Sequence, residues 1–241
     1  MQVTALHEQV LSLAGVPALV LSLQPPEVAA RRGTVLVLHG LTASKEIQRT
    51  EALSLARHGY LAVALDAVGH GARRYPDFEE RFAEARMEPS FYEVVEQSAA
   101  ELPAVLDALR ARGWALPGRV GACGISMGGF ILFGAVVARV ALDAVVPLVA
   151  SPHWVLSTRS PHLQLDRFFP TPLLIQNASD DQTVLPAAAR ALHQALLPRY
   201  AAAPERLRYV EHENEPHLLT ERAWHLAWAD TLGWFDRFLQ G

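Results

Sequence analysis

A serine with a glycine two residues away on either side is the clearest chemical signal in the sequence. Ser126 lies between Gly124 and Gly128, in the pattern G-x-S-x-G. An apolar run precedes this motif and a longer one follows it, so we expect the serine at a sharp turn from a strand into a helix. Both glycines are needed because strand and helix nearly touch there. The hydroxyl would stand at the tip of the turn, with the N–H of Met127 directed at a developing oxyanion.

Two carboxylates and a histidine further along the chain could activate this serine. Asp180 and Asp181 follow an apolar run at 172–177, and His217 follows the last such run, at 207–210. A serine hydroxyl is a poor nucleophile without a base to take its proton, and the base needs an acceptor on its other nitrogen. The three residue types therefore predict nucleophilic catalysis by serine.

These residues need a scaffold that brings strand ends together, and the chain alternates apolar runs with segments of helical spacing. Strands are predicted at 10–13, 18–23, 34–38, 61–65, 119–123, 144–150, 172–177 and 207–210, and helices at 45–58, 91–112, 127–138, 187–197 and in the last segment through Leu239. Such alternation predicts an α/β fold with a mostly parallel, doubly wound sheet. Functional groups then gather at the C-terminal ends of the strands. We expect one domain over residues 1–241.

Two segments lack a regular pattern. Residues 72–89 mix alternating charges with aromatic residues, and we interpret them as a small lid insertion. Residues 151–170 show no periodicity, and their Trp154, Phe168 and Phe169 are candidates either for a substrate pocket or for the core. The sequence favours neither interpretation.

Composition narrows the class of protein. The chain has 241 residues, 51% of them hydrophobic, and a formal net charge of −4. This length and composition are sufficient for one large hydrophobic core. Its only paired basic residues are 31–32 and 73–74, so we expect no nucleic-acid partner. Cys123 is the only cysteine, which rules out an internal disulfide and suits a reducing compartment.

We expect neither a secretory signal nor a membrane span. Residues 1–30 contain no Lys or Arg, whereas a signal peptide begins with positive charge. The apolar stretch 127–150 is interrupted by Arg139, Asp143 and Pro147, so a buried helix followed by a strand explains it better than a span. The expected location is cytoplasmic.

Other histidines have simpler interpretations than catalysis or metal binding. His212 and His217 are five residues apart with Pro216 between them, so one helix face cannot present both to a zinc ion. We therefore expect no metal and no cofactor. His39 and His70 sit in predicted loops and are interpreted as braces.

With these motifs in place, the chain resembles α/β-hydrolases, and most of all the small bacterial carboxylesterases of the dienelactone-hydrolase-like branch. The matching pieces are His39-Gly40 with Ser44-Lys45, the loop from Asp66 to Arg73, the segment 124–129, the acidic loop ending at Val184, and His217. The chain departs from the family in having Asn177-Ala178 where His-Gly is usual, and Pro216 where glycine often precedes the histidine. Many dienelactone hydrolases use cysteine where this chain has Ser126.

The resemblance implies a role for each residue. Ser126 would be the nucleophile, His217 the general base and acid, and Asp181 the carboxylate that orients the imidazole, while the N–H groups of Leu41 and Met127 would form the oxyanion hole. Asp180 stays an alternative to Asp181, because one extra residue before the next helix would shift the register.

The implied activity is hydrolysis of a small soluble ester through an acyl-enzyme. Peptidase, thioesterase and lactonase activity remain open on the same triad. The rival from another class is a catalytically silent protein of this fold, used for ligand binding or protein interaction. Nothing in the sequence indicates the oligomeric state.

Overall fold

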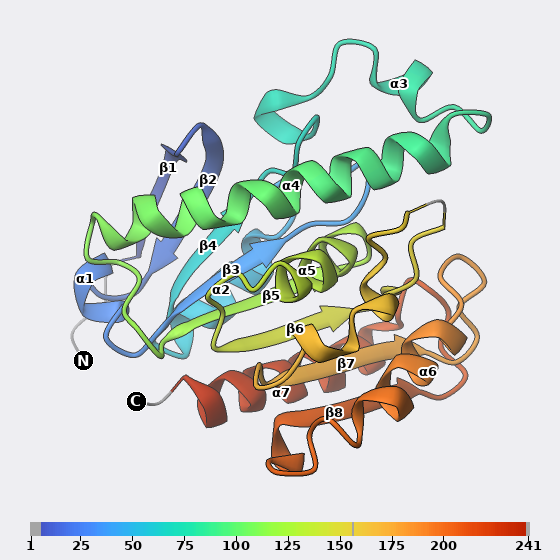
Figure 1. Ribbon diagram of the computed structural model, residues 1–241. Coiled ribbons are helices and arrows are strands. Elements are labelled where there is room, and N and C mark those ends of the chain that lie inside the picture. The colour runs from blue at the N-terminus through green and yellow to red at the C-terminus, as the bar shows by residue number, and fades with distance from the viewer. Residues whose placement is uncertain (1–5, 156, 240–241) are drawn as a thin grey trace.

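One eight-stranded sheet forms the centre of the protein, in a computed structural model that describes residues 6–155 and 157–239 (Figure 1). The strands lie in the order β1-β2-β4-β3-β5-β6-β7-β8. Their bounds are β1 His7–Leu13, β2 Val16–Ser22, β3 Thr34–Leu38, β4 Leu61–Leu65, β5 Val120–Ile125, β6 Ala144–Leu148, β7 Leu173–Ala178 and β8 Leu207–His212. β1 and β2 form an antiparallel hairpin, and every pairing from β4 to β8 is parallel. The predicted mostly parallel sheet is thus confirmed.

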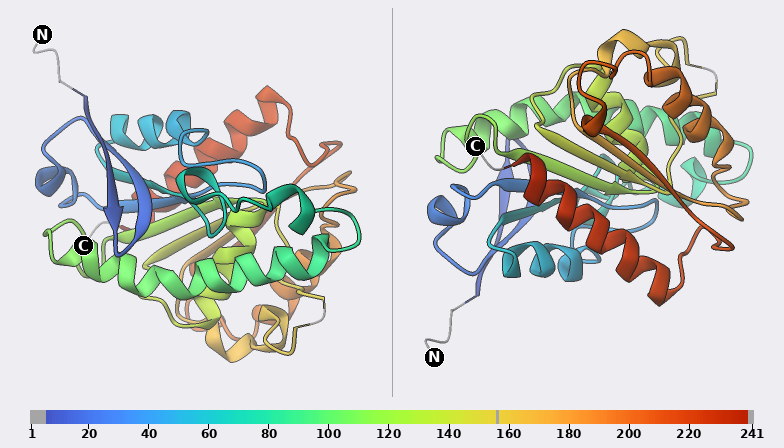
Figure 2. Two further views of the ribbon diagram at one scale, coloured as in Figure 1. Left: turned by 90° about the horizontal axis from the view of Figure 1, so that it is seen from above. Right: turned by 90° about the horizontal axis from the view of Figure 1, so that it is seen from below.

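Helices cover both faces of the sheet, as the two views of Figure 2 show. The longer helices are α2 Arg49–Arg57, α4 Met87–Arg110, α5 Met127–Val137, α6 Ala187–Leu196 and α7 Glu221–Phe238. Short helical turns lie at α1 Pro26–Ala29, Gly71–Arg73, α3 Phe78–Arg81, Pro161–Leu163, Leu165–Arg167 and Pro204–Arg206.

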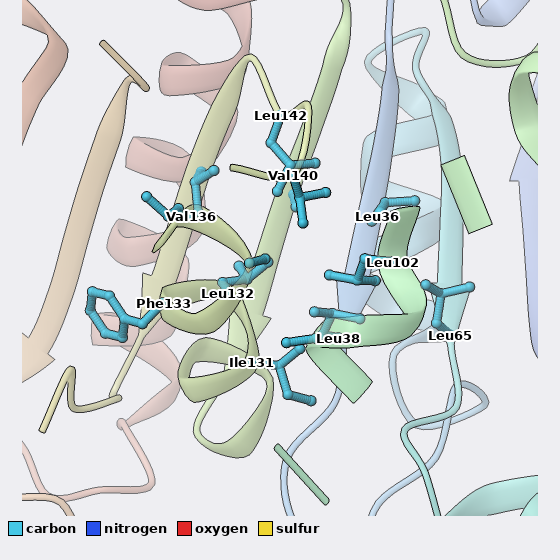
Figure 3. Packing of buried hydrophobic residues seen from close by; sticks show 14 of the residues in the cluster. Leu36, Leu38, Leu65, Leu102, Ile131, Leu132, Phe133, Val136, Val140 and Leu142 are labelled. Carbon is cyan, nitrogen blue, oxygen red and sulfur yellow. The ribbon is translucent and has the colours of Figure 1, made fainter. Parts of the chain in front are cut away.

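Alternate residues of β3 divide the core into two layers. Leu36 and Leu38 belong to the cluster that contains the buried faces of α4, α5 and α6. Val35 and Val37 point the other way, into the cluster with α2 and α7. Figure 3 shows the first layer, where these leucines face side chains such as Leu102 of α4. Burial on both faces explains why β3 is apolar throughout.

The order of the strands places the functional groups at one edge. In the sheet, β3 lies between β4, the next strand along the chain, and β5, the strand after that. The sheet therefore changes winding direction between β3 and β5, and ligands of open α/β sheets bind where this happens. The loop after β3 and the turn after β5 meet at this point.

Some predicted boundaries were wrong by several residues. The helix expected from residue 45 begins at Arg49, because the backbone before it forms tighter turns, in which the N–H of Ile47 donates to the carbonyl of Ser44 and that of Arg49 to the carbonyl of Glu46. α4 begins at Met87, inside the segment assigned to the lid. β8 extends to His212 because it stays paired with β7 as far as Ala178.

The segment 72–89 is anchored by its aromatic residues. Phe78 and Phe82 are buried, 3% and 8% exposed, and their rings contact the ring of His70 with centroids 5.0 and 5.8 Å apart. These side chains thus belong to the core. Most of the charged residues of the segment are exposed, whereas Arg73 donates to the carbonyls of Asp66 and Ala67. Its action as a lid stays a prediction.

The three aromatic residues of the segment 151–170 are largely interior. Phe168 is fully buried, and its carbonyl accepts the hydroxyl hydrogen of Tyr200 at 2.9 Å. Phe169 packs edge-on against the same tyrosine ring. Burial therefore supports the core interpretation for Phe168, and Phe169 is partly buried against the same core. Trp154 is also buried, 4% exposed, but it lines a surface cavity of about 360 Å³ between α4 and α5.

Within residues 6–155 and 157–239, none of the helices has both the length and the apolar character that crossing a bilayer requires.

Candidate active site

The turn between β5 and α5 holds Ser126 in a strained backbone conformation. Its φ of 52° and ψ of −116° lie outside the backbone regions that residues other than glycine favour. A Cβ on Gly124 would lie 2.3 Å from the carbonyl oxygen of Gly128, and a Cβ on Gly128 would lie 2.2 Å from the carbonyl oxygen of Leu38. Both glycines are therefore required by contact between strand and helix. The serine's own N–H donates to Leu148 of β6 at 2.9 Å, which fixes the turn to the sheet.

His217 joins the serine to an acid. Its Nε2 lies 3.0 Å from Oγ of Ser126, and its Nδ1 lies 2.6 Å from Oδ2 of Asp181. With a neutral imidazole, Nδ1–H donates to the carboxylate and Nε2 accepts the hydroxyl hydrogen. The histidine side chain is 17% exposed and the aspartate side chain is fully buried. This is the geometry in which an imidazole can take the serine proton.

The two adjacent aspartates differ in their surroundings. Asp181 accepts hydrogen bonds on Oδ1 from the N–H groups of Thr183 and Val184, at 2.8 and 2.7 Å, so only Oδ2 is left for the imidazole. Asp180 is exposed, and its Oδ1 accepts the hydroxyl hydrogen of Ser179. The structure thus brings Asp181 and not Asp180 to His217.

His212 lies at the end of β8, away from this chain of hydrogen bonds. Its Nε2 is 3.2 Å from Oε1 of Gln176, so it donates there. Gln176 in turn donates to the carbonyl of Ala227 and to the hydroxyl of Thr231. His212 therefore ties β8 to β7 and α7.

The loop after β3 passes beside the serine. A Cβ on Gly40 would lie 3.7 Å from Cβ of Ser126. Preceding it, His39 is fully buried and uses both ring nitrogens, because Nδ1–H donates to the carbonyl of Gly40 at 2.7 Å and Nε2 accepts the N–H of Ala67 at 3.0 Å. Burial lowers the pKa of His39, so it is a neutral brace. A trans peptide directs the N–H of Leu41 opposite to the carbonyl that His39 holds.

An aromatic cluster beside the serine was missed by the sequence interpretation. Phe130 lies one helical turn after Ser126, and its ring contacts those of Phe91 and Tyr92 of α4, with centroids 5.0 and 6.5 Å apart. Tyr92 also lines a surface cavity of about 440 Å³, whose other side is formed by Val155 and residues 157–159. The i+4 spacing from Ser126 could have identified Phe130, but its partners come from another helix.

The part of the chain that the structure describes contains no group of three His, Cys, Asp or Glu side chains placed to hold a metal ion. Cys123, three residues before the serine, is fully buried, and burial raises the pKa of its thiol. It is therefore a core residue and not a second nucleophile.

Similar proteins support the assignment of the fold. The chain matches a curated protein of Bacillus subtilis (strain 168) named "Putative esterase YitV", with 27% identity over 235 residues that cover 85% of this chain and 89% of the relative. The solved structure of TT1662 from Thermus thermophilus has a TM-score of 0.82 at 23% identity and covers 98% of this chain and 99% of that one.

A dienelactone hydrolase from Anabaena variabilis is also similar, with a TM-score of 0.66 at 21% identity, 98% of this chain and 99% of that chain being covered. These likenesses confirm the α/β-hydrolase fold. Residues 29–167, more than half of the chain, match the family described as serine aminopeptidase S33. The matched segment contains the loop after β3, the end of β4 and the serine turn, and the chain accordingly belongs to this family of hydrolases.

Proposed function

We propose that the protein is a serine carboxylesterase that cleaves a small soluble ester through an acyl-enzyme, without a cofactor. The observation that carries the proposal is the continuous hydrogen-bonded chain from Ser126 through His217 to Asp181, at 3.0 and 2.6 Å. Its supports are the strained serine turn and the membership in a hydrolase family. A cytoplasmic location is part of the proposal, and it is supported by the single cysteine of the sequence, which suits a reducing compartment.

Each residue has a defined task in the proposed reaction. His217 removes the hydroxyl proton as Ser126 attacks the ester carbonyl, and the N–H groups of Met127 and Leu41 stabilise the resulting oxyanion. The protonated imidazole then gives its proton to the departing alcohol, which leaves an acyl-serine. In the second step, His217 takes a proton from water, which attacks the acyl-serine; the proton returns to Ser126 and the carboxylic acid is released. Asp181 stabilises the imidazolium in both steps.

Labelling with a fluorophosphonate tests the nucleophile. We expect wild-type protein to be labelled and to hydrolyse nitrophenyl acetate, and Ser126→Ala to lose both properties while its thermal unfolding stays cooperative. Ser151→Ala is the matched control, because Ser151 follows the neighbouring strand β6 and its hydroxyl accepts the N–H of His153, outside the proposed triad. Labelling that persists in Ser126→Ala would refute the assignment, and an unlabelled wild type would favour a catalytically silent protein.

Peptidase activity is the second candidate, because the matched family is described as serine aminopeptidase. The same triad can attack an amide, and the difference lies in how the leaving amine is bound and protonated. Aminoacyl nitroanilides assayed beside nitrophenyl esters separate the two activities. A kcat/KM on the amide equal to that on the ester would assign the peptidase function instead.

A further inference from the structure

A buried ion pair lies outside the three residues of the proposed triad. The side chain of Lys45 is 2% exposed and that of Asp66 is fully buried, with Nζ and Oδ2 2.9 Å apart. The N–H of Lys45 also donates to Oδ1 of Asp66 at 2.8 Å, and the N–H of Ala72 donates to Oδ2 at 2.8 Å. One carboxylate thus connects the loop after β3 with the segment after β4.

The backbone of the following loop packs tightly against the carboxylate of Asp66. Gly71 has a φ of 55°, and a Cβ on it would lie 2.0 Å from Oδ1 of Asp66. Burial opposes the charge of Lys45, yet hydrogen bonds to Glu46 and Asp66 raise its pKa above the ordinary value. Lys45 is therefore charged at neutral pH. Buried pairs contribute little net stability compared with apolar residues of the same size, so stability alone does not account for it.

The ion pair is one of two contacts that fix the two ends of the loop 39–45. At the start of the loop, His39 accepts the N–H of Ala67. At the end of the loop, Lys45 binds Asp66, which immediately precedes Ala67 in the chain. The loop is thus fixed to two consecutive residues at the end of β4, and between these attachments Gly40 passes beside Ser126.

We propose that Lys45 and Asp66 are positioning residues for the oxyanion hole: their ion pair holds the loop 39–45 so that the N–H of Leu41 stays directed at the substrate carbonyl oxygen. This inference rests on the proposed function, since it requires that Ser126 forms an acyl-enzyme and that Leu41 supplies one donor. Neither Lys45 nor Asp66 needs to touch the substrate.

The predicted signature is a loss of turnover without a comparable loss of substrate binding. The oxyanion forms only in the transition state, so a displaced donor lowers kcat and leaves KM nearly unchanged. Losing one such donor typically costs ~10²–10³ in turnover, and a displacement of about 1 Å can cost ~10². A role in stability alone would lower the melting temperature and leave kcat of the folded protein unchanged.

The test compares Lys45→Met and Asp66→Asn with wild type, in nitrophenyl ester kinetics and in inhibition by a boronic acid that forms a tetrahedral adduct with serine. In both variants we expect kcat to fall about 10- to 100-fold with KM within about threefold, and the boronic acid to bind more weakly by a similar factor as kcat/KM. Tyr60→Phe is the control, because Tyr60 precedes β4 at its other end and its buried hydroxyl binds Asp236. It should lower the melting temperature and leave kcat unchanged.

Two results would overturn the positioning role: a kcat within about twofold of wild type in the folded variants, or unchanged affinity for the boronic acid. If Lys45→Met does not fold, Asp66→Asn decides, since it keeps the size and shape of the side chain. Wild-type protein that neither hydrolyses esters nor reacts with a fluorophosphonate would refute the proposed function itself. An active wild type with unaffected variants would refute only the positioning role.

Discussion

Oδ2 of Asp181 lies 2.6 Å from Nδ1 of His217, while Oδ1 of the same carboxylate accepts two backbone N–H groups of its own loop. The loop therefore fixes the rotation of the carboxylate, and the carboxylate fixes the tautomer and orientation of the imidazole. Asp180, its exposed neighbour, has no part in this arrangement. The difference between two adjacent residues of one type gives a direct test of the proposed triad.

Asp181→Asn should lower kcat by about 10⁴-fold, because the amide oxygen would meet the N–H groups of Thr183 and Val184, and the NH₂ group would then face Nδ1 of the imidazole and favour the wrong tautomer. Asp180→Asn should change kcat little, because its side chain bonds only the hydroxyl of Ser179. The measurement is ester hydrolysis by both purified variants, with folding checked by circular dichroism. Greater loss in Asp180→Asn would move the orienting role to that residue.

The two late histidines give a second paired comparison. His217→Ala should abolish turnover, since it removes the base that contacts Ser126 at 3.0 Å. His212→Ala should reduce stability slightly and retain most of the kcat, since it loses a single hydrogen bond to Gln176. Nitrophenyl acetate hydrolysis at neutral pH distinguishes them. Equal losses in both variants would contradict the assignment.

Strands buried on both faces were the most predictable part of the fold. The bounds of β3 and β4 match the predicted runs residue for residue, because an apolar run of only five residues is too short for a buried helix and fits a strand covered on both faces. The start of α2 was misplaced, because the N–H groups of Ile47 and Arg49 close tighter turns before the helix begins. Asp66, 21 residues further along the chain, accepts the N–H of Lys45 in this segment, and local periodicity does not register such a contact.

The candidate site likewise has residues that the sequence predicts and residues that depend on packing between distant segments. A local pattern predicts Ser126, and order and position after strands predict His217 and the pair Asp180-Asp181. The choice of Asp181 came from the resemblance to the family. The aromatic residues offered for the pocket, in contrast, came from a segment without periodicity, and Phe168 lies in the core. Phe91 and Tyr92 reach Phe130 only because α4 packs on α5, and sequence spacing says nothing about contacts between helices.

The glycines of two helices should respond to alanine in opposite ways. Gly128→Ala should destabilise the protein by about 3 kcal/mol or more, because its Cβ would lie 2.2 Å from the carbonyl oxygen of Leu38. Gly233→Ala in α7 should stabilise it by about 0.5–1 kcal/mol, because no heavy atom lies within 4 Å of a Cβ there. Urea unfolding measures both. A neutral effect at Gly128 would contradict the close contact between strand and helix.

Short acyl esters should be better substrates than long ones. The aromatic side chains Phe78 and Phe82 of the predicted lid are turned into the core, and many of the exposed residues of that segment are charged, so little apolar surface is left for a long chain. A panel of nitrophenyl esters of rising chain length measures the preference. A peak of kcat/KM on chains longer than about ten carbons would contradict this prediction.

His70 should make the stability of the protein depend on pH. Its side chain is fully buried, its Nδ1–H donates to the carbonyl of Val68 at 2.8 Å, and its ring packs against Phe78 and Phe82. Burial lowers its pKa from 6.5 to about 4; the hydrogen bond to Val68 and the charge of Asp66 oppose this shift, and His39 and Arg74 reinforce it. The folded protein therefore keeps His70 neutral where the unfolded chain protonates it.

The sign of the effect follows from proton uptake. Between the folded pKa of about 4 and the unfolded value of 6.5, the unfolded state binds one more proton at this residue, so stability rises with pH in that range. The contribution is complete above the unfolded value and is lost as the pH falls toward 4, by up to about 3 kcal/mol. His70→Asn keeps a donor near the carbonyl of Val68 and removes the titration.

Urea unfolding between about pH 4.5 and pH 7 should then show a shallower slope of the unfolding free energy for His70→Asn, by up to one proton. His225→Gln, at an exposed position of α7, should retain the wild-type slope. The slope and not the absolute stability is the readout, because asparagine also changes the packing against the two phenylalanine rings. Equal slopes in wild type and His70→Asn would show that the buried imidazole is not the group whose protonation opposes folding.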